Sequence, residues 1–373
     1  SGLDPNPTTA IDLFISAGEI SGDLHGSKLI EKIHEINPSC AIGAVAGPKM
    51  RQCAIQEFFK MEDLLVMGFI DVVQALPRLY RQFFAIRNQI VRLNPKVVVL
   101  IDYPGLHLRL AKSLKKQGFL GKIVHYICPT VWAWKKNRIF FMETYLDHLL
   151  TIFPFELKCF ENTTLSVEYV GHPLVPTTSR FQPSGKFQGK ILALFPGSRK
   201  AEIERNLPLQ LKVAKRLQAL DPELQIILSK SPLDLDIPGV QTVPPEDNYE
   251  LMSAALLAIA TSGTVTLELA LMGVPTVVNF AIRPMDCWIA KNIFRIHLPF
   301  YCIVNILLEQ EVFPELFGPH FTEEALFYWS KKFWGEESAR KHAKNLCKEV
   351  RKYLGIKDAS KEAAKTIVSF IDF

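Results

Sequence analysis

The sequence lacks the features that define several common classes of protein. Its longest aliphatic run, at Val97–Ile101, falls far short of the roughly 20 apolar residues of a transmembrane helix. Residues 1–10 have no basic region and no apolar core, which argues against a signal peptide. Because the chain also begins without methionine, we expect a processed chain or a fragment of a longer one.

Cysteine pattern and charge exclude further classes. The seven cysteines are odd in number, scattered, and form no C-x-x-C pair, which predicts free thiols in a reducing cytoplasm. No His/Cys/Asp cluster has zinc spacing and no H-E-x-x-H occurs, so we expect no metal site. The net charge of +5, from 43 basic and 38 acidic residues, is too small for a dedicated nucleic-acid binder.

What is present is a long, apolar, globular chain. Its 373 residues predict two domains. A content of 48% hydrophobic and 22% charged residues excludes a disordered protein. The mean hydropathy of +0.12 is high for a chain without a membrane span, and 25 phenylalanines contribute to it.

Short β-rich runs alternate with amphipathic helical stretches, which predicts parallel sheets. The strands are expected at 11–17, 41–46, 97–101, 122–127, 149–153, 190–195, 224–229, 256–260 and 276–280. The helices are expected at 23–36, 106–117, 199–220 and 264–271, and again from residue 322 onward. The stretch 171–189 is rich in proline, glycine, serine and threonine, which predicts an interdomain linker.

Two loops in the second half have the composition of phosphate-binding turns. In the first, Gly197, Ser198 and Arg199 join a strand to a helix, whose N-terminus suits an anion. In the second, Ser262, Gly263 and Thr264 surround a similar turn, and Glu268 lies one helical turn further on, where it could accept hydrogen bonds from a ribose. Ordinary capped turns explain either loop alone. Together, without a Walker A or G-x-G-x-x-G motif, they favour a nucleoside diphosphate over NAD.

Polar residues also follow the strands of the first half. Glu19, Ser21 and Asp23 surround a glycine turn, with His25 just beyond, which is more than helix capping requires. Asp102 ends an apolar strand and is a candidate general base, although capping of the next helix explains it equally well. Trp132 precedes three cations and suggests a cleft wall, with core packing as the usual alternative.

Apolar residues recur at helical spacing in 61–85. An amphipathic core helix is the commoner explanation. The alternative is a patch that enters a bilayer or receives acyl chains, with flanking arginines facing anionic lipid. The residues of this candidate membrane patch are Leu65, Val66, Phe69, Val72, Val73 and Leu76.

These motifs, in this order, resemble those of the lipid-A-disaccharide synthase family. The matching segments are AGEISGD (17–23), VAGPKM (45–50), MEDLLVMGF (61–69), HYICPTVWAW (125–134), VGHPL (170–174), LALFPGSRKAEI (192–203), TSGTVTLELAL (261–271) and VNILLEQEVFPEL (304–316). Each segment alone is weak evidence, but together they are specific.

The resemblance implies an α/β protein of the GT-B class, with two Rossmann-like domains facing across a cleft. Residues 1–171 would form the acceptor and membrane-facing domain, 190–321 the UDP-sugar domain, and 322–373 a helical tail packing back on the first domain. The implied reaction is a metal-independent, inverting transfer of 2,3-diacylglucosamine from its UDP derivative to the 6-hydroxyl of 2,3-diacylglucosamine 1-phosphate. It needs no cofactor, since the UDP-sugar is a substrate.

The resemblance also implies partners and site residues. The enzyme would associate peripherally with the inner face of the inner membrane of a Gram-negative bacterium and would bind no nucleic acid. The resemblance is compatible with a homodimer but does not decide the oligomeric state. Asp102 and Ser21 would be catalytic, and Glu19, Asp23, His25 and Trp132 would line the acceptor site. The residues implied for the UDP-sugar are Arg199, Ser198, Ser262, Gly263, Thr264, Glu268 and Asn305.

Some positions depart from the family pattern. Pro104 is followed by Gly105, Leu106 and His107, where the family usually has Asp-Phe-Asn, so Asp102 is the only carboxylate left in that motif. Gln310 stands where a family cation is usual, which would shift the grip on the phosphates to other cations such as Lys200 or Arg283. Two other functions stay open: a non-catalytic nucleotide-sugar-binding protein, and a GT-B-like UDP-sugar epimerase.

Overall fold

The computed structural model describes residues 10–65, 69–129, 136–230, 237–283 and 299–372, without the side chains of 69–72 and 136. The chain forms two compact units. Unit 1 comprises residues 1–173 and 357–373, and unit 2 comprises residues 174–356. The chain therefore leaves unit 1 once and returns to it near its end.

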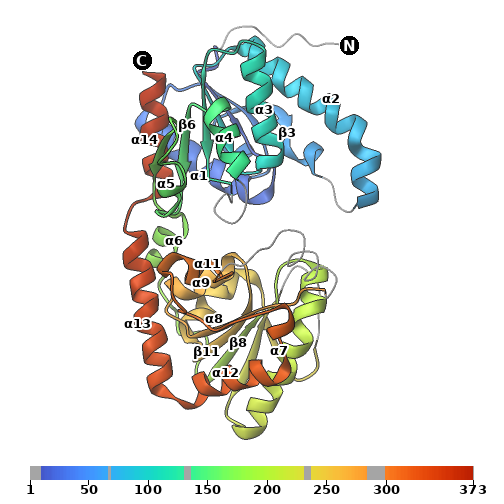
Figure 1. The fold of residues 1–373 in the computed structure, drawn as a ribbon, viewed down its shortest axis with the longest axis vertical. Coiled ribbons are helices and arrows are strands. Elements are labelled where there is room, and N and C mark those ends of the chain that lie inside the picture. The colour runs from blue at the N-terminus through green and yellow to red at the C-terminus, as the bar shows by residue number, and fades with distance from the viewer. Residues whose placement is uncertain (1–9, 66–68, 130–135, 231–236, 284–298, 373) are drawn as a thin grey trace. The chain divides into compact units, whose positions relative to one another are not determined.

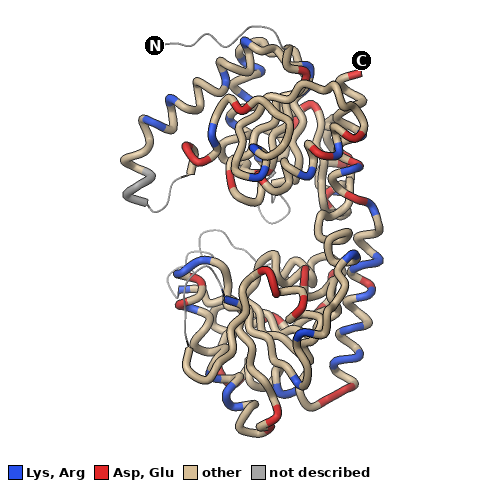
Figure 2. The backbone as a smooth tube through the Cα atoms, turned by 180° about the vertical axis from the view of Figure 1, so that it is seen from behind, with Lys and Arg blue, Asp and Glu red and all other residues tan. Residues whose placement is uncertain are grey.

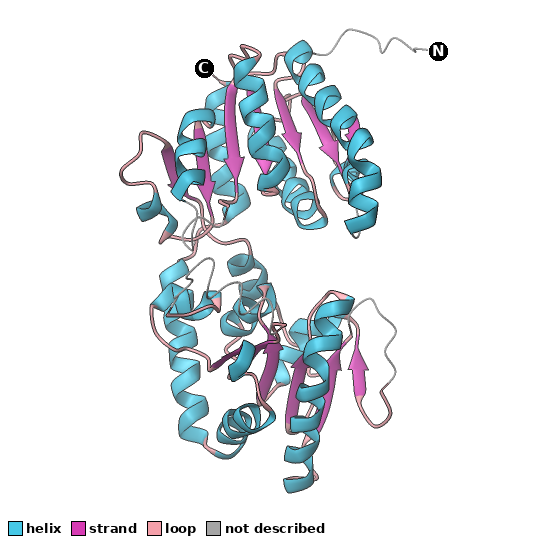
Figure 3. Ribbon diagram, turned by 45° about the vertical axis from the view of Figure 1, so that its right-hand side comes forward, coloured by secondary structure: helices cyan, strands magenta, loops and turns pink. Residues whose placement is uncertain are grey.

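A seven-stranded parallel sheet forms the centre of unit 1. Its strands are β1 (Leu13–Ser16), β2 (Ile42–Ala46), β3 (Gln56–Lys60), β4 (Val97–Ile101), β5 (Lys122–Tyr126), β6 (His148–Thr151) and β7 (Ser166–Tyr169). They lie in the order β3-β2-β1-β4-β5-β6-β7. Every residue of β1, β2 and β4 is buried, because helices cover both faces of the sheet (Figure 3).

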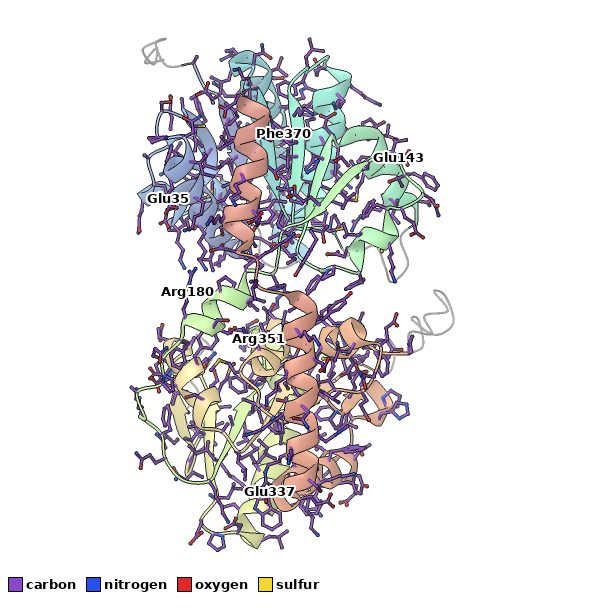
Figure 4. The ribbon with its side chains drawn as sticks, turned by 90° about the vertical axis from the view of Figure 1, so that its left-hand side faces the viewer. Glu35, Glu143, Arg180, Glu337, Arg351 and Phe370 are labelled. Carbon is purple, nitrogen blue, oxygen red and sulfur yellow. The ribbon has the colours of Figure 1, made fainter. Side chains whose placement is uncertain are left out.

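The helices of unit 1 come from both parts of its chain. They are α1 (Ile20–Ile36), α2 (Phe69–Leu93), α3 (Pro104–Lys116), α4 (Lys136–Tyr145), α5 (Glu156–Cys159) and α14 (Ala359–Ile371), with 3-10 turns η1 (Met50–Gln52) and η2 (Met61–Leu64). Helix α14, red in Figure 1, packs on α1 and against β4 and β5. Its Phe370, labelled in Figure 4, contacts the His148 ring at 5.3 Å between centroids.

Unit 2 has a six-stranded parallel sheet. Its strands are β8 (Ile191–Phe195), β9 (Gln225–Ser229), β10 (Gln241–Val243), β11 (Leu257–Thr261), β12 (Thr276–Phe280) and β13 (Glu315–Phe317), in the order β10-β9-β8-β11-β12-β13. Its helices are α6 (Leu174–Arg180), α7 (Lys200–Leu220), α8 (Asn248–Ala254), α9 (Thr264–Leu271), α11 (Ile303–Leu308), α12 (Glu323–Gly335) and α13 (Glu337–Leu354), with 3-10 turns η3 (Pro245–Asp247) and η4 (Gly318–His320).

One side chain joins the first and last helices of unit 2. The Arg351 guanidinium of α13 donates to Thr178 Oγ1 at 2.9 Å in α6 and to the carbonyl of Leu271 at 2.7 Å. Figure 4 shows Arg351 beside α6, which carries Arg180. Helix α6 occupies part of the segment predicted as a linker. Its Pro176 lies in the first turn, where no backbone N–H is needed.

Both sheets have the doubly wound strand order, which confirms the predicted fold class of two Rossmann-like domains with a helical C-terminal region. The direction of strand order reverses between β1 and β4 in unit 1, and between β8 and β11 in unit 2. Ligands of such sheets bind beyond the strand ends at this reversal. The predicted tail divides, because residues 322–356 belong to unit 2 and residues 357–373 to unit 1.

Candidate functional site

At the reversal point of unit 1, the loops after β1 and β4 touch. Asp102 and Tyr103 follow β4 with φ of 45° and 47°, in the left-handed region that residues with side chains rarely adopt. The Tyr103 ring lies so close to Gly18 that a Cβ there would be 2.5 Å from Tyr103 Cδ1. Only glycine therefore fits at position 18, and the two loops form one surface.

Asp102 carries a carboxyl group with a raised pKa. Burial raises the pKa of its carboxyl to about 6, and the nearby charge of Glu19 contributes to the rise. A carboxylate with a pKa near neutrality is a more effective proton acceptor than one with an ordinary pKa. Tyr103 is the N-cap of α3, and no side chain caps that helix, so the capping explanation of Asp102 is wrong.

The other predicted acceptor-side residues have different surroundings. The buried Asp23 carboxylate accepts hydrogen bonds from the backbone N–H of Gly47, Lys49 and Met50 at 3.1, 2.8 and 3.0 Å, so it holds the loop after β2. Ser21 is exposed in the first turn of α1. Burial lowers the pKa of His25 to about 4, with a smaller contribution from the positive charge of Lys28, so its ring is neutral at pH 7. Trp132 lies outside the described residues.

In unit 2, the loop after β8 leads into α7. Gly197 has φ 120°, and Ser198 and Arg199 are exposed, with Arg199 at the N-cap. Glu202 Oε1 accepts the Ser198 N–H at 3.3 Å, and a Cβ on Gly197 would collide with that same oxygen. Sequence reasoning missed Glu202, although a glutamate three residues after an N-cap is a known capping signal.

The loop after β11 leads into α9. The Ser262 N–H donates to the carbonyl of Asn279 at 2.9 Å, Gly263 is the N-cap, and Thr264 is the exposed first residue of α9. Glu268 is half-buried and hydrogen-bonded by Tyr249 of α8, and burial raises the pKa of its carboxyl. Tyr249 was also missed. The acceptance of hydrogen bonds from a ribose by Glu268 stays a prediction.

Buried amides support both loops of unit 2 from below. Gln210 Nε2 donates to Asn279 Oδ1 at 2.8 Å, and Asn279 Nδ2 donates to Asn206 Oδ1 at 2.8 Å. The Thr261 hydroxyl donates to the carbonyl of Pro196 at 2.9 Å. These contacts fix α7 against the ends of β8, β11 and β12. The sequence signal was the pair of amides four residues apart on the buried face of α7.

Asn305 is fully buried, and its side chain is satisfied within its own segment. Its Nδ2 donates to the carbonyl of Phe313 at 2.8 Å and to Glu315 Oε1 at 2.9 Å. Its Oδ1 accepts the N–H groups of Val312 and Phe313 at 2.8 and 3.0 Å. Contact between this side chain and a UDP-sugar stays a prediction. The surroundings show a residue that shapes the turn after α11.

The candidate membrane patch is only partly described. Leu65, Val73 and Leu76 are exposed, and Val73 retains 52% of its accessible surface. Val66 and the side chains of Phe69 and Val72 lie outside the described residues. Helix α2 continues the same apolar side with exposed residues further along. These are Tyr80 and Phe84.

Two observations bear on the alternatives for α2. Ile86 and Ile90 are buried, so the core explanation holds for the C-terminal half of the helix and not for its exposed stripe. Residues 73–93 of α2 carry basic and no acidic side chains (Figure 2), and Asp71, the acidic residue of the helix, lies in its first turn, where side chains are not described. No helix within the described ranges is long and apolar enough to cross a membrane. Among those residues, no group of three or more His, Cys, Asp or Glu could hold a metal ion.

Solved structures with the same architecture define the class of the fold. A UDP-GlcNAc 2-epimerase from Neisseria meningitidis, bound to UDP-GlcNAc, matches 96% of this chain and 99% of its own with a TM-score of 0.60 at 11% identity. A calicheamicin glycosyltransferase matches 98% of this chain and 99% of its own with a TM-score of 0.57 at 11% identity. At such identities the likeness shows the fold alone, which is that of the two-domain GT-B class.

The sequence comparisons identify the family. Residues 13–369 match the family model of lipid-A-disaccharide synthetase, and the chain belongs to this family. The lipid-A-disaccharide synthase of Geobacter metallireducens is 31% identical over 377 residues, which cover 96% of this chain and 97% of that protein. The one from Chlamydia pneumoniae is 40% identical over 323 residues, 82% of this chain. The match spans about half (53%) of that chlamydial relative's length.

Proposed function

We propose that this chain catalyses the formation of a lipid A disaccharide. It transfers 2,3-diacylglucosamine from its UDP derivative to the 6-hydroxyl of 2,3-diacylglucosamine 1-phosphate, with inversion and without a metal or cofactor. Membership of the family supports the reaction class. The single observation that carries the chemistry is the half-buried carboxyl of Asp102, which lies near Glu19. Burial raises the pKa of the Asp102 carboxyl to about 6.

The proposed step is one displacement. Asp102 takes the proton of the acceptor 6-hydroxyl, the oxygen forms a bond to the anomeric carbon of the donor, and the bond from that carbon to the diphosphate oxygen breaks. UDP leaves with the electron pair. Arg199 and the N–H groups at the starts of α7 and α9 stabilise the diphosphate charge, and Glu268 accepts hydrogen bonds from the ribose.

The exposed stripe of α2 would bring the enzyme to its substrates. Both substrates carry two acyl chains each, so they reside in a bilayer surface. Val73, Leu76 and Tyr80 provide an apolar face, and the basic side chains of α2 would meet anionic lipid on the inner face of the inner membrane. Peripheral attachment of this kind needs no spanning helix.

Turnover with both glycolipid substrates tests the proposal. We expect UDP release only when donor and acceptor are both present, a disaccharide 1-phosphate product with inverted anomeric configuration by NMR, and full activity with a chelator. Donor binding without turnover would instead identify a binding protein. An isomerised UDP-sugar formed from the donor alone would identify an epimerase, the enzyme named in one similar structure.

Asp102→Asn is the decisive variant. Loss of the base should lower kcat by about 10²–10⁴-fold while donor binding is kept. The wild-type rate should fall below about pH 6, because a protonated Asp102 accepts no proton. Glu35→Gln is the matched control, since Glu35 is an exposed carboxylate of the same unit, labelled in Figure 4. Activity of Asp102→Asn equal to that of Glu35→Gln would remove Asp102 from the mechanism.

A further inference from the structure

One buried imidazole connects the two strands at the reversal point of unit 1. His107, in α3, is fully buried. Its Nε2 lies 2.8 Å from the hydroxyl of Ser16, and its Nδ1 lies 2.7 Å from the backbone carbonyl oxygen of Asp102. Ser16 ends β1 and Asp102 follows β4, so His107 holds both loops of the candidate acceptor site.

The partners determine which nitrogen carries the proton. A carbonyl oxygen only accepts, so Nδ1 of His107 is the donor to Asp102. Burial lowers the pKa of His107 to about 4, so the ring is neutral at pH 7. Its Nε2 is therefore an acceptor, and the Ser16 hydroxyl donates to it. Every hydrogen-bonding group of this arrangement is satisfied without a proton transfer.

A serine beside a histidine suggests a nucleophile, but this pair lacks the other parts of such a site. Ser16 is fully buried within the sheet, so a substrate cannot meet its hydroxyl. The second nitrogen of His107 is bonded to a backbone carbonyl and not to a carboxylate, which is the partner that stabilises a histidine acting as a base. His107 is thus fitted to hold the loop and not to react.

The loop that His107 holds is strained. Asp102 and Tyr103 are consecutive residues whose backbones both lie in the left-handed region. Residues other than glycine keep this backbone conformation only where their surroundings fix it. Asp102 N–H donates to the carbonyl of Tyr126 at 2.8 Å, and His107 bonds its carbonyl. The Tyr103 ring packs edge-on against the His107 ring, with centroids 6.2 Å apart.

We propose that His107 is a positioning residue that fixes the backbone of Asp102 through its Nδ1–H and thereby holds the catalytic carboxylate in its half-buried position. The inference rests on the proposed function of Asp102 as the base. An asparagine amide reaches the place of Nδ1 but not the place of Nε2, so it retains the bond to Asp102 and loses the one to Ser16.

Three variants separate the two hydrogen bonds. His107→Gln carries its amide nitrogen near the position of Nε2 and loses the donor to Asp102. His107→Asn keeps that donor, and Ser16→Ala removes only the other bond. We expect kcat of His107→Gln to fall about 100-fold, as for a misplaced catalytic group, with KM for both substrates within about 3-fold. Both other variants should retain kcat within about 5-fold.

The pH profile supplies a readout that a merely structural role would not move. Without the clamp, the Asp102 carboxylate gains access to water, so its pKa should fall and the acidic limb of kcat for His107→Gln should move below its wild-type position near pH 6. Among the described residues, the other titratable groups that interact with Asp102 are Glu19, Cys128, Glu156 and His125. None of these four residues is replaced, and His125, whose ring packs against that of His107, stays neutral because burial lowers its pKa to about 3, so the shift reports the surroundings of Asp102.

Each result decides one question. A His107→Gln enzyme with the wild-type kcat and the wild-type acidic limb of its pH profile overturns the positioning role. A His107→Asn enzyme whose kcat falls as far as that of His107→Gln overturns it too. Should His107→Gln fail to fold, ¹⁵N NMR of wild-type His107 decides, because a proton on Nε2 contradicts the clamp and one on Nδ1 supports it. A wild-type protein without turnover refutes the proposed function instead, and an active Asp102→Asn variant removes Asp102, and with it the positioning role of His107, from the mechanism.

Discussion

Replacing Asn305 by aspartate tests whether this predicted UDP-sugar residue shapes its own segment. Asn305→Asp keeps the shape of the side chain and the oxygen that accepts from Val312 and Phe313. It replaces the Nδ2 donor by an oxygen, which then faces the carbonyl of Phe313 at 2.8 Å and Glu315 Oε1 at 2.9 Å. Two hydrogen bonds are lost, and the new carboxylate oxygen faces two other oxygens that can only accept.

The expected loss follows from these contacts. A neutral hydrogen bond contributes about 1 kcal/mol to stability and one to a charged group about 1.5–3 kcal/mol, so unit 2 should lose about 2.5–4 kcal/mol at neutral pH. Burial already raises the pKa of Glu315. A proton shared between the two carboxyl groups would restore one hydrogen bond, so the loss should shrink as the pH falls and one of them becomes protonated.

The assay has to resolve the two units, because they need not unfold together. Urea unfolding followed by hydrogen exchange reports each unit through its own peptides, and the amides of Val312 and Phe313 report the turn itself. Asn345→Asp is the matched control, since Asn345 is exposed on α13 in the same unit. A variant with wild-type stability at pH 7 but a raised KM for the UDP-sugar would refute the structural reasoning and make Asn305 a ligand contact.

Two further predictions concern unit 1. The Glu156 carboxyl is buried, accepts from the Thr151 hydroxyl at 2.8 Å, and has its pKa raised by burial from 4.5 to about 7. The folded state therefore holds a proton that the unfolded state has lost, so stability should decline by about 3 kcal/mol as the pH rises from 4.5 to about 7. Glu156→Gln should remove this slope in urea titrations, and an unchanged slope would contradict the assignment. The double variant Val73→Ser/Leu76→Ser should bind anionic vesicles about 10-fold or more weakly, with an unchanged melting temperature, since both side chains are exposed. Leu120→Ser, at a residue 94% exposed outside α2, is the control, and equal binding of both proteins would contradict the membrane role of α2.

The central strands could be predicted closely, and the edge strands could not. The five apolar residues of β4 coincide with the predicted strand, because burial on both faces leaves an uninterrupted apolar run. Strand β3 has polar residues at both ends and one neighbouring strand, as edge strands commonly do, so its composition resembles a loop. Helix α6 was hidden by the proline and threonines that also suggested a linker.

The candidate site was predictable to the level of loops. Parallel strands bring their carboxyl ends to one edge, so the polar residues after β1, β4, β8 and β11 could be grouped from the sequence. The roles of single residues depend on contacts across long separations. Asn206 meets Asn279, and Asp23 meets the loop after β2. A single sequence does not reveal such pairs, nor that Asn305 is buried, because an amide near a loop is normally exposed.

The return of α14 to unit 1 affects the order in which the two units can complete their folding during synthesis. A ribosome delivers all seven strands of the first sheet long before the helix that covers α1, β4 and β5. Unit 2, whose residues are contiguous, can finish folding first although it is synthesised second. Until α14 has been synthesised and docks, the apolar surface that receives its Ala363, Ile367 and Ile371 is open to chaperones and proteases. Nascent chains stalled so that residue 356 has just left the ribosomal exit tunnel should therefore show a protected second unit beside a first unit that still awaits its last helix.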